Sequence, residues 1–129
     1  MRMPSIALAA LAALVAGQAS SQPAPKAAAP TQCFRQSDID NSVQASQTTL
    51  NLKTRDNRYF QIQTKGVCFT TLGVDPYVLK IRGAGDLVCH PIDLDISAGP
   101  RGFQTTCIVD KIVPMTKAQV MALPKRDQP

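Results

Sequence analysis

Four cysteines and one short cluster of ionisable residues are the features of this 129-residue sequence that could carry chemistry. The cluster contains Asp86, His90, Asp93 and Asp95. Its carboxylates could hold a divalent cation, and an Asp–His pair could transfer protons as general acid and base. However, Asp93 and Asp95 alternate with isoleucine and leucine, which is typical of a strand with one solvated face. We therefore expect a surface strand here, with His90, Asp93 and Asp95 as possible ligand contacts only.

The cysteines Cys33, Cys68, Cys89 and Cys107 are even in number, which favours disulfide bonds in an exported chain. Of the three possible pairings we predict Cys33–Cys68, because these residues precede and follow a predicted hairpin. We predict Cys89–Cys107 across a second hairpin, where an offset of a few residues is needed to bring the two cysteines together. The sequence has no C-x-x-C pair, which disfavours a zinc site and a thioredoxin-like redox centre.

Catalytic signatures are missing from the sequence: we find no G-x-S-x-G, no H-E-x-x-H and no phosphate-binding loop. We therefore predict that the protein is not an enzyme and that it uses no cofactor and no metal.

Residues 1–19 have the features of a signal peptide. Arg2 supplies a positive start, and Ile6–Ala16 is an uninterrupted apolar run, shorter than the roughly 20 residues that a membrane-spanning helix needs. Gly17 and Ala19 provide small residues at the −3 and −1 positions of a cleavage site. We expect export through a cleaved leader, a periplasmic location, and no transmembrane segment in the mature chain.

The mature chain divides into three parts by composition. Residues 20–32 are rich in alanine and proline and predict a flexible linker. Residues 33–124 form one predicted domain, which is small enough that cross-links would help to stabilise it. Residues 125–129 are predicted to be a disordered tail.

Alternating apolar residues predict a mainly β fold. The predicted elements are a hairpin of residues 48–53 and 59–63, a strand 77–82, a strand 87–96 interrupted at Pro91, a strand 103–113, and a short helix 117–123. The helix begins with a capping box, because Thr116 is followed three residues later by Gln119. We predict a small antiparallel barrel or open sandwich with a short C-terminal helix, stapled by disulfides.

A wider pattern covers Cys33 to Pro124. It includes Cys33-Phe34, Tyr59-Phe60, Cys68, the C-x-P-x-D-x-D stretch that begins at Cys89, and Cys107-Ile108-Val109. This pattern resembles a bacterial domain-of-unknown-function family of small exported proteins. The resemblance implies a Gram-negative periplasmic setting and a single domain, and it adds no catalytic residue.

The charge of the chain is moderately basic, with 14 lysine and arginine residues against nine acids. The cations are scattered, so we expect a solvated surface, with weak attraction to anionic envelope surfaces as the functional alternative. Binding to nucleic acid is not expected, since no basic run is interleaved with aromatic residues.

We therefore predict a non-enzymatic envelope protein that binds another protein or a cell-envelope component. One alternative is an inhibitor of an envelope hydrolase that uses the loop Ser97–Gly102, with Arg101 as a contact, because a preorganised loop loses little entropy on binding. A second alternative is a metal-binding protein or enzyme that uses the Asp86–Asp95 cluster.

Overall fold

A predicted hairpin lies at the centre of the structure. The computed structural model describes residues 33–129, so the predicted leader and linker, residues 1–32, lie outside the described residues. Strands β3 (Thr49–Thr54) and β4 (Tyr59–Thr64) pair antiparallel, with Leu52 opposite Phe60. The turn between them places Asn57 at a positive φ of 60°, which asparagine tolerates better than most residues. This element is confirmed as predicted.

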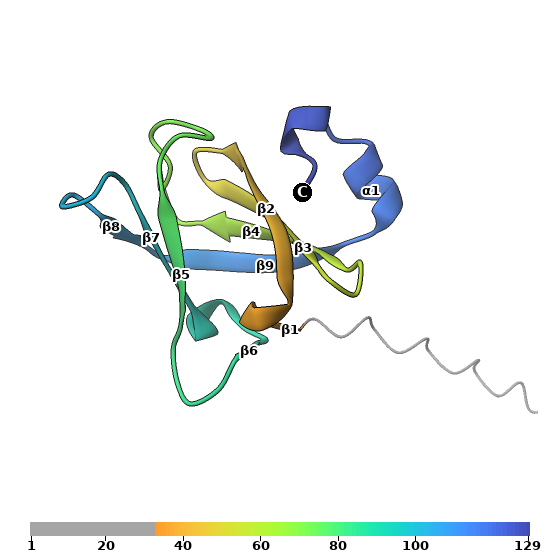
Figure 1. The fold of residues 1–129 in the computed structure, drawn as a ribbon, viewed down its shortest axis with the longest axis horizontal. Coiled ribbons are helices and arrows are strands. Elements are labelled where there is room, and N and C mark those ends of the chain that lie inside the picture. Colours follow the sequence, from red (N-terminus) through yellow and green to blue (C-terminus); the bar gives the residue numbers. More distant parts are fainter. Residues whose placement is uncertain (1–32) are drawn as a thin grey trace, which may run out of the picture.

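The hairpin belongs to a four-stranded antiparallel sheet with the order β2-β3-β4-β9 (Figure 1). Strand β9 (Val109–Met115) lies beside β4 and completes one edge. Strand β2 (Ile39–Ser46) follows a 3-10 turn, η1 (Gln36–Asp38), and forms the other edge. The sequence did not predict β2, because its residues lack a regular alternation of apolar and polar side chains.

A second, three-stranded antiparallel sheet has the order β5-β7-β8, from β5 (Tyr77–Ile81), β7 (Leu94–Ala98) and β8 (Thr105–Cys107). Two short strands, β1 (Phe34–Arg35) and β6 (Leu87–Val88), form a separate pair. The predicted strand 87–96 is therefore split by the 3-10 turn η2 (Pro91–Asp93), since Pro91 cannot donate to a ladder. The predicted strand 103–113 is likewise divided, into β8 and β9.

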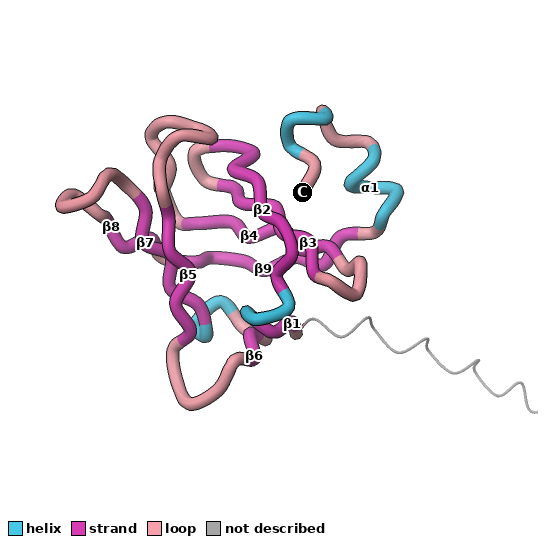
Figure 2. Tube along the Cα trace, in the orientation of Figure 1, coloured by secondary structure: helices cyan, strands magenta, loops and turns pink. Residues whose placement is uncertain are grey.

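The three sheets curl around one apolar core but are not closed into a barrel (Figure 2). The fold is mainly β with a short C-terminal helix, so the predicted fold class is confirmed. Of the two predicted forms, a barrel or an open sandwich, the structure has the open one. The rings of Phe34 and Phe60 pack with centroids 4.8 Å apart. Residues from all three sheets join this core: Phe34, Leu50, Leu52, Phe60, Ile62, Cys68, Phe69, Val88, Leu94, Ile96, Ala98, Cys107 and Val109.

The structure has two disulfides, and both predicted pairings are wrong. Cys33 is bonded to Cys89, and Cys68 is bonded to Cys107. Strand β1 pairs with β6, with Phe34 opposite Val88, so that Cys33 lies opposite Cys89.

The Cys68–Cys107 bridge also depends on contacts between segments that are distant in sequence. The Lys65 amide donates to the carbonyl of Ile108 at 2.8 Å, which brings the segment after β4 beside the junction of β8 and β9. Cys107 itself lies opposite Ile96 in the β7–β8 ladder, well away from Cys89. The prediction failed because it joined the ends of local hairpins, whereas the bridges join strands that are distant in sequence.

The C-terminal segment is ordered. Helix α1 (Lys117–Met121) begins with the predicted capping box, in which the Gln119 amide donates to the Thr116 hydroxyl at 3.2 Å and the Thr116 amide donates to Gln119 Oε1 at 2.8 Å. A 3-10 turn, η3 (Lys125–Asp127), follows. The predicted disordered tail is therefore incorrect: the buried side chain of Asn51 donates to the carbonyl of Asp127 at 2.8 Å and holds the segment against β2 and β3.

Removing the Cys68–Cys107 bridge tests the contribution of disulfides to stability. The double variant Cys68→Ala/Cys107→Ala should lose about 2–4 kcal/mol of unfolding free energy. The bridge closes a loop with a sequence separation of 39 residues and so restricts the conformations of the unfolded chain. Urea unfolding with and without the bridge measures this loss.

Non-reducing peptide mapping of the native protein should recover Cys33–Cys89 and Cys68–Cys107, and peptides joining Cys33 to Cys68 would contradict the structure.

Candidate functional site

A groove of about 770 Å³ lies beside β2. This volume lies within the range of about 300–1,000 Å³ that is usual for ligand pockets. Its residues come from β2, from the loop before β5 and from the C-terminal turn: Ser42, Val43, Gln44, Ala45, Leu72, Gly73, Val74, Asp75, Pro76, Tyr77, Arg126 and Asp127. We call this hollow the β2 groove.

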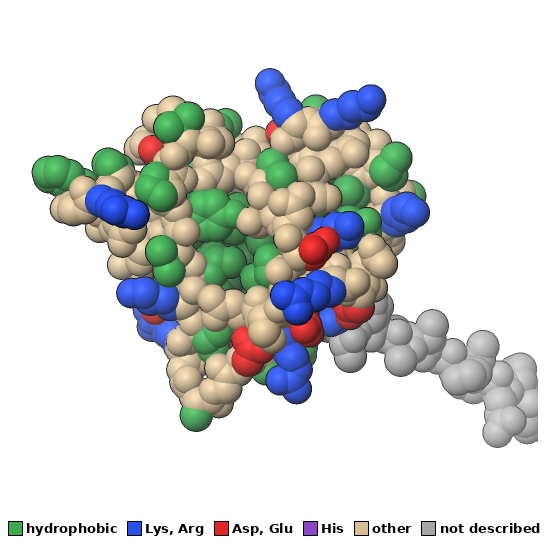
Figure 3. All heavy atoms as spheres, viewed as in Figure 1, with side chains coloured by type: hydrophobic (Ala, Val, Ile, Leu, Met, Phe, Trp, Pro, Cys, Tyr) green, Lys and Arg blue, Asp and Glu red, His purple; other side chains and the backbone are tan. Residues whose placement is uncertain are grey.

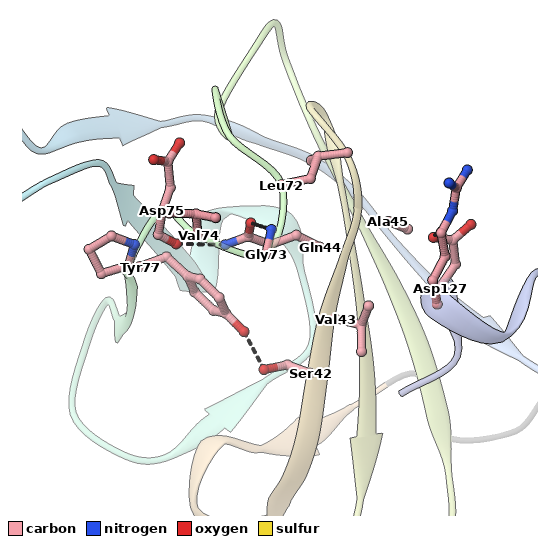
Figure 4. A pocket seen from close by; sticks show the side chains of 12 residues that line it. Ser42, Val43, Gln44, Ala45, Leu72, Gly73, Val74, Asp75, Tyr77 and Asp127 are labelled. Atoms are coloured by element: carbon pink, nitrogen blue, oxygen red, sulfur yellow. Dashed lines mark hydrogen bonds and ion pairs between the residues drawn. The ribbon is translucent and has the colours of Figure 1, made fainter.

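The β2 groove runs along the free edge of a strand. Four consecutive residues of β2, from Ser42 to Ala45, line it. Successive side chains of a strand point to opposite faces, so four neighbours share one hollow only if that hollow follows the main-chain edge. Figure 4 shows this arrangement: Ser42 and Gln44 point toward Tyr77 and the loop before β5, whereas Val43 and Ala45 point toward Asp127.

One wall of the groove is joined to β2 by side chains and not by a backbone ladder. The Ser42 hydroxyl is hydrogen-bonded to the phenol of Tyr77. The Gln44 amide nitrogen donates to the carbonyl of Asp75 at 2.8 Å, and the Gly73 amide donates to Gln44 Oε1 at 2.8 Å. These bonds span the opening between the two sheets while leaving the edges of β2 and β5 without a neighbouring strand.

A further side-chain hydrogen bond spans the opening between the two sheets outside the groove. The Gln36 side chain donates to the carbonyl of Leu79 at 2.7 Å, on the side of β5 that faces away from β7. We call this set of contacts, made by Gln36, Ser42 and Gln44, the side-chain seam. The seam fixes the separation of β2 and β5.

The loop before β5 is shaped by one carboxylate. Asp75 Oδ2 accepts hydrogen bonds from the Thr70 hydroxyl at 2.6 Å, from the Thr71 amide at 2.7 Å and from the Thr70 amide at 2.8 Å. The Thr70 hydroxyl and the Thr71 amide lower the pKa of Asp75 below its usual value, because they stabilise the charged carboxylate. Leu72 and Val74 are thereby held at the rim of the groove.

The opposite wall is the C-terminal turn η3. It rests on a chain of amides in which Gln63 donates to Gln61 at 2.9 Å, Gln61 donates to Asn51 at 3.2 Å, and Asn51 donates to the carbonyl of Asp127. Arg126 pairs with Asp127 at 3.6 Å, so the exposed Lys125 leaves this turn with one excess positive charge.

The groove offers hydrogen bonds and apolar contacts. Its polar side chains are already paired within the wall, and the single histidine of the chain, His90, lies elsewhere, before η2. Both edges, by contrast, present main-chain groups beside apolar side chains such as Val43, Leu72 and Val74. This combination favours recognition of a polypeptide main chain.

The structure gives the predicted acidic cluster three separate sets of partners. Asp86 accepts hydrogen bonds from the hydroxyl and amide of Ser37, which lower its pKa. Asp93 accepts from the amides of Cys89 at 3.0 Å and His90 at 2.8 Å, which lower its pKa.

The third carboxylate of the cluster, Asp95, is paired with Arg82 at 2.7 Å. Asp93 closes the first turn of η2 and Asp95 lies on β7, so each acid has a local structural partner. Within residues 33–129, no group of three or more acidic, histidine or cysteine side chains is placed to hold a metal ion.

Arg101 lies on the protruding loop between β7 and β8, away from the acidic cluster and from the β2 groove. The loop is exposed from Pro100 to Thr105. The hypothesis that this loop inhibits an envelope hydrolase stays a prediction.

Sequence reasoning missed the residues of the groove. Ser42 and Tyr77 come from segments 35 residues apart, and nothing in the local pattern around Ser42 indicates a strand. The only available signal was the unusual run of small polar residues after Ile39, which suits an edge strand as well as a loop.

No protein-family model, no curated protein and no solved structure matches this chain. The resemblance to a family of exported bacterial proteins therefore stays a prediction. None of the helices formed by residues 33–129 is long and apolar enough to cross a bilayer.

Replacing Asp75 tests the carboxylate that shapes the groove loop. Because the pKa of Asp75 is lowered in the folded state, its stabilising effect is complete above the pKa of the unfolded chain, about 3.9, and is lost as the pH falls through the lower folded value. Asp75→Asn should melt at a lower temperature than the parent protein at pH 7, and the difference should narrow below about pH 4.

A series of thermal melts between neutral and acid pH measures this effect. Asp110→Asn is the matched control, because its exposed contact with Lys65, at 3.8 Å, should contribute little. A constant difference between Asp75→Asn and the parent at every pH would contradict the assigned role.

Proposed function

We propose that this chain is an exported, non-enzymatic binding module of the cell envelope, which takes up an extended segment of a partner polypeptide as an additional strand on β2. The observation that carries this proposal is the run Ser42–Ala45, four consecutive residues that line one groove along the free edge of a strand. Addition of a strand to an exposed sheet edge is a common mode of peptide recognition.

The hydrogen bonds of β2 support an incoming strand. The Ser42 amide donates to Asn41 Oδ1 at 2.8 Å, so it points away from the β3 ladder. Because the direction of main-chain groups repeats every two residues, the Gln44 amide should point the same way. A peptide carbonyl can replace the Asn41 side chain at Ser42, and main-chain bonds of this kind would supply affinity.

The two walls of the groove would supply selectivity. Side chains of an added strand alternate between the face of Leu72 and Val74 and the face of Arg126. Apolar side chains suit the first face, and an acidic side chain suits the second, where Arg126 is exposed beside Asp127 and the neighbouring Lys125 adds a second exposed cation. We therefore expect an extended segment in which apolar and acidic residues occupy alternate positions.

Irregularities at both ends of β2 limit what can bind. The β2–β3 register shifts between Ile39 and Asn41 and again between Gln44 and Ser46. Such bulges twist a strand and interrupt pairing, which protects an edge from continuous self-association. The regular part is short, so the added strand would pair over about four residues.

The proposed compartment rests on separate observations. Two disulfides within one small domain are typical of proteins that fold in an oxidising compartment. The predicted signal peptide and the resemblance to exported bacterial proteins favour the periplasm of a Gram-negative cell.

A matched pair of variants tests strand addition. Ser42→Pro removes the outward amide and leaves the β3 side of the strand in place, whereas Ser42→Ala keeps the amide and loses only the hydroxyl. A displayed library of random ten-residue peptides would be selected against the mature protein, and the recovered peptides synthesised. We expect Ser42→Pro to weaken their binding by about tenfold or more and Ser42→Ala to weaken it by only a few-fold.

Hydrogen exchange provides the second readout. Bound peptide should slow exchange of the Ser42 and Gln44 amides, and thermal melts should show that both variants remain folded. The proposal fails if no peptide is enriched, if the enriched peptides protect amides outside β2, or if Ser42→Pro binds them as the parent does.

A further inference from the structure

A second surface, which adjoins the β2 groove at Val74, carries three exposed apolar side chains. Val74 is 72% exposed, Val78 is 42% exposed and Phe103 is 82% exposed. We call these three residues the apolar rim. Figure 3 shows apolar side chains at the side of the molecule where β5 and the β7–β8 loop lie.

The members of the apolar rim are brought together by the second sheet. Val78 pairs with Ser97 across the β5–β7 ladder, on the outer face of the sheet. The Gly99 amide donates to the carbonyl of Pro76 at 3.0 Å, which ties the loop that bears Phe103 to the segment that follows Val74. Two loops and one strand therefore present apolar side chains at the same corner.

The loop that carries Phe103 has a fixed shape. Gly99 has a φ of +123°, and a Cβ at this position would lie 2.8 Å from the carbonyl oxygen of Phe103. The Phe103 amide donates to the carbonyl of Pro100 at 3.0 Å. The phenyl ring is thus held outward by its own backbone turn and remains exposed to solvent.

The charges around the apolar rim are mainly positive. Arg101 is exposed two residues before Phe103, and Lys80 is exposed two residues after Val78 on the same face of β5. Two acids lie in this region. Asp75 is engaged by Thr70 and Thr71, and Asp95, which lies opposite Lys80 in the β5–β7 ladder, is paired with Arg82 at 2.7 Å. The whole chain also has an excess of cations, 14 against nine acids.

We propose that the apolar rim docks on the surface of an anionic lipid bilayer, with Phe103 inserted between headgroups and Arg101 and Lys80 beside lipid phosphates. The β7–β8 loop protrudes from the molecule (Figure 1), and the side chains of the rim stand on two loops and one strand, which suits a deformable interface more than the matched pocket of a protein. Apolar side chains that enter the headgroup region, flanked by lysine and arginine, are the combination that binds proteins to anionic membranes.

Vesicle sedimentation tests this inference on the mature protein. Vesicles of phosphatidylcholine alone would be compared with vesicles in which part of the lipid is phosphatidylglycerol. We expect binding to the anionic vesicles that weakens with added salt. Phe103→Ser should lower the partition coefficient by about tenfold or more, and Arg101→Gln should lower it less and reduce the salt dependence.

Two controls make the result specific. Ile92→Ser changes another strongly exposed residue, 73% accessible, at the opposite end of β7, and it should bind vesicles as the parent does. Ser42→Pro should also bind them normally, so failure of the peptide proposal and failure of this one are distinguishable. Phe103→Trp gives a direct signal, since the fluorescence of the introduced indole should shift to the blue on anionic vesicles.

The inference is overturned if the parent protein stays in solution with both vesicle types, if Phe103→Ser sediments as well as the parent, or if Ile92→Ser loses binding to the same extent. An unshifted emission from the Phe103→Trp variant in the presence of anionic vesicles would also overturn it. If the protein does not bind vesicles, the exposed loop between β7 and β8 would instead be a contact site for a protein partner.

Discussion

The structure depends on the covalent connection between sheets that share no backbone ladder. The backbone ladders of the four-stranded and three-stranded sheets lie within each sheet, and the Cys68–Cys107 bridge joins the segment after β4 to the end of β8. The Cys33–Cys89 bridge fixes the short β1–β6 pair at the N-terminal start of the domain. These bonds add to a small apolar core, which alone gives limited stability in a domain of this size.

Because the disulfides hold the sheets together on one side of the domain, strands β2 and β5 on the other side need not pair. Strands β2 and β5 approach each other there without pairing, and the side-chain seam of Gln36, Ser42 and Gln44 sets their separation. A closed barrel would use these main-chain groups in its own ladder. The open form keeps them at the surface of a groove, which is the physical basis for a binding role.

The sequence predicted the elements whose signals are local. The β3–β4 hairpin follows from its alternating residues and turn, and α1 follows from the capping box of Thr116 and Gln119. Long-range features could not be predicted in this way. The disulfide pairing depends on β1 meeting β6, and the groove depends on β2, whose polar residues lack the period of a half-buried strand because one of its edges and much of its surface face solvent. The sequence kept a metal or catalytic role for the acidic cluster only as an alternative, and its members, which are neighbours in sequence, have separate partners in space.

The order of the disulfides has a consequence for biogenesis. The bridges interleave, since the first cysteine along the chain is bonded to the third and the second to the fourth. Under the export that we propose, the chain crosses a membrane from its N-terminus and presents Cys33 and Cys68 to the oxidising machinery before Cys89 emerges. Cross-linking in order of appearance would trap a wrong isomer, which thiol–disulfide exchange must then rearrange. Production of this protein should therefore rely on an isomerase as well as on an oxidant.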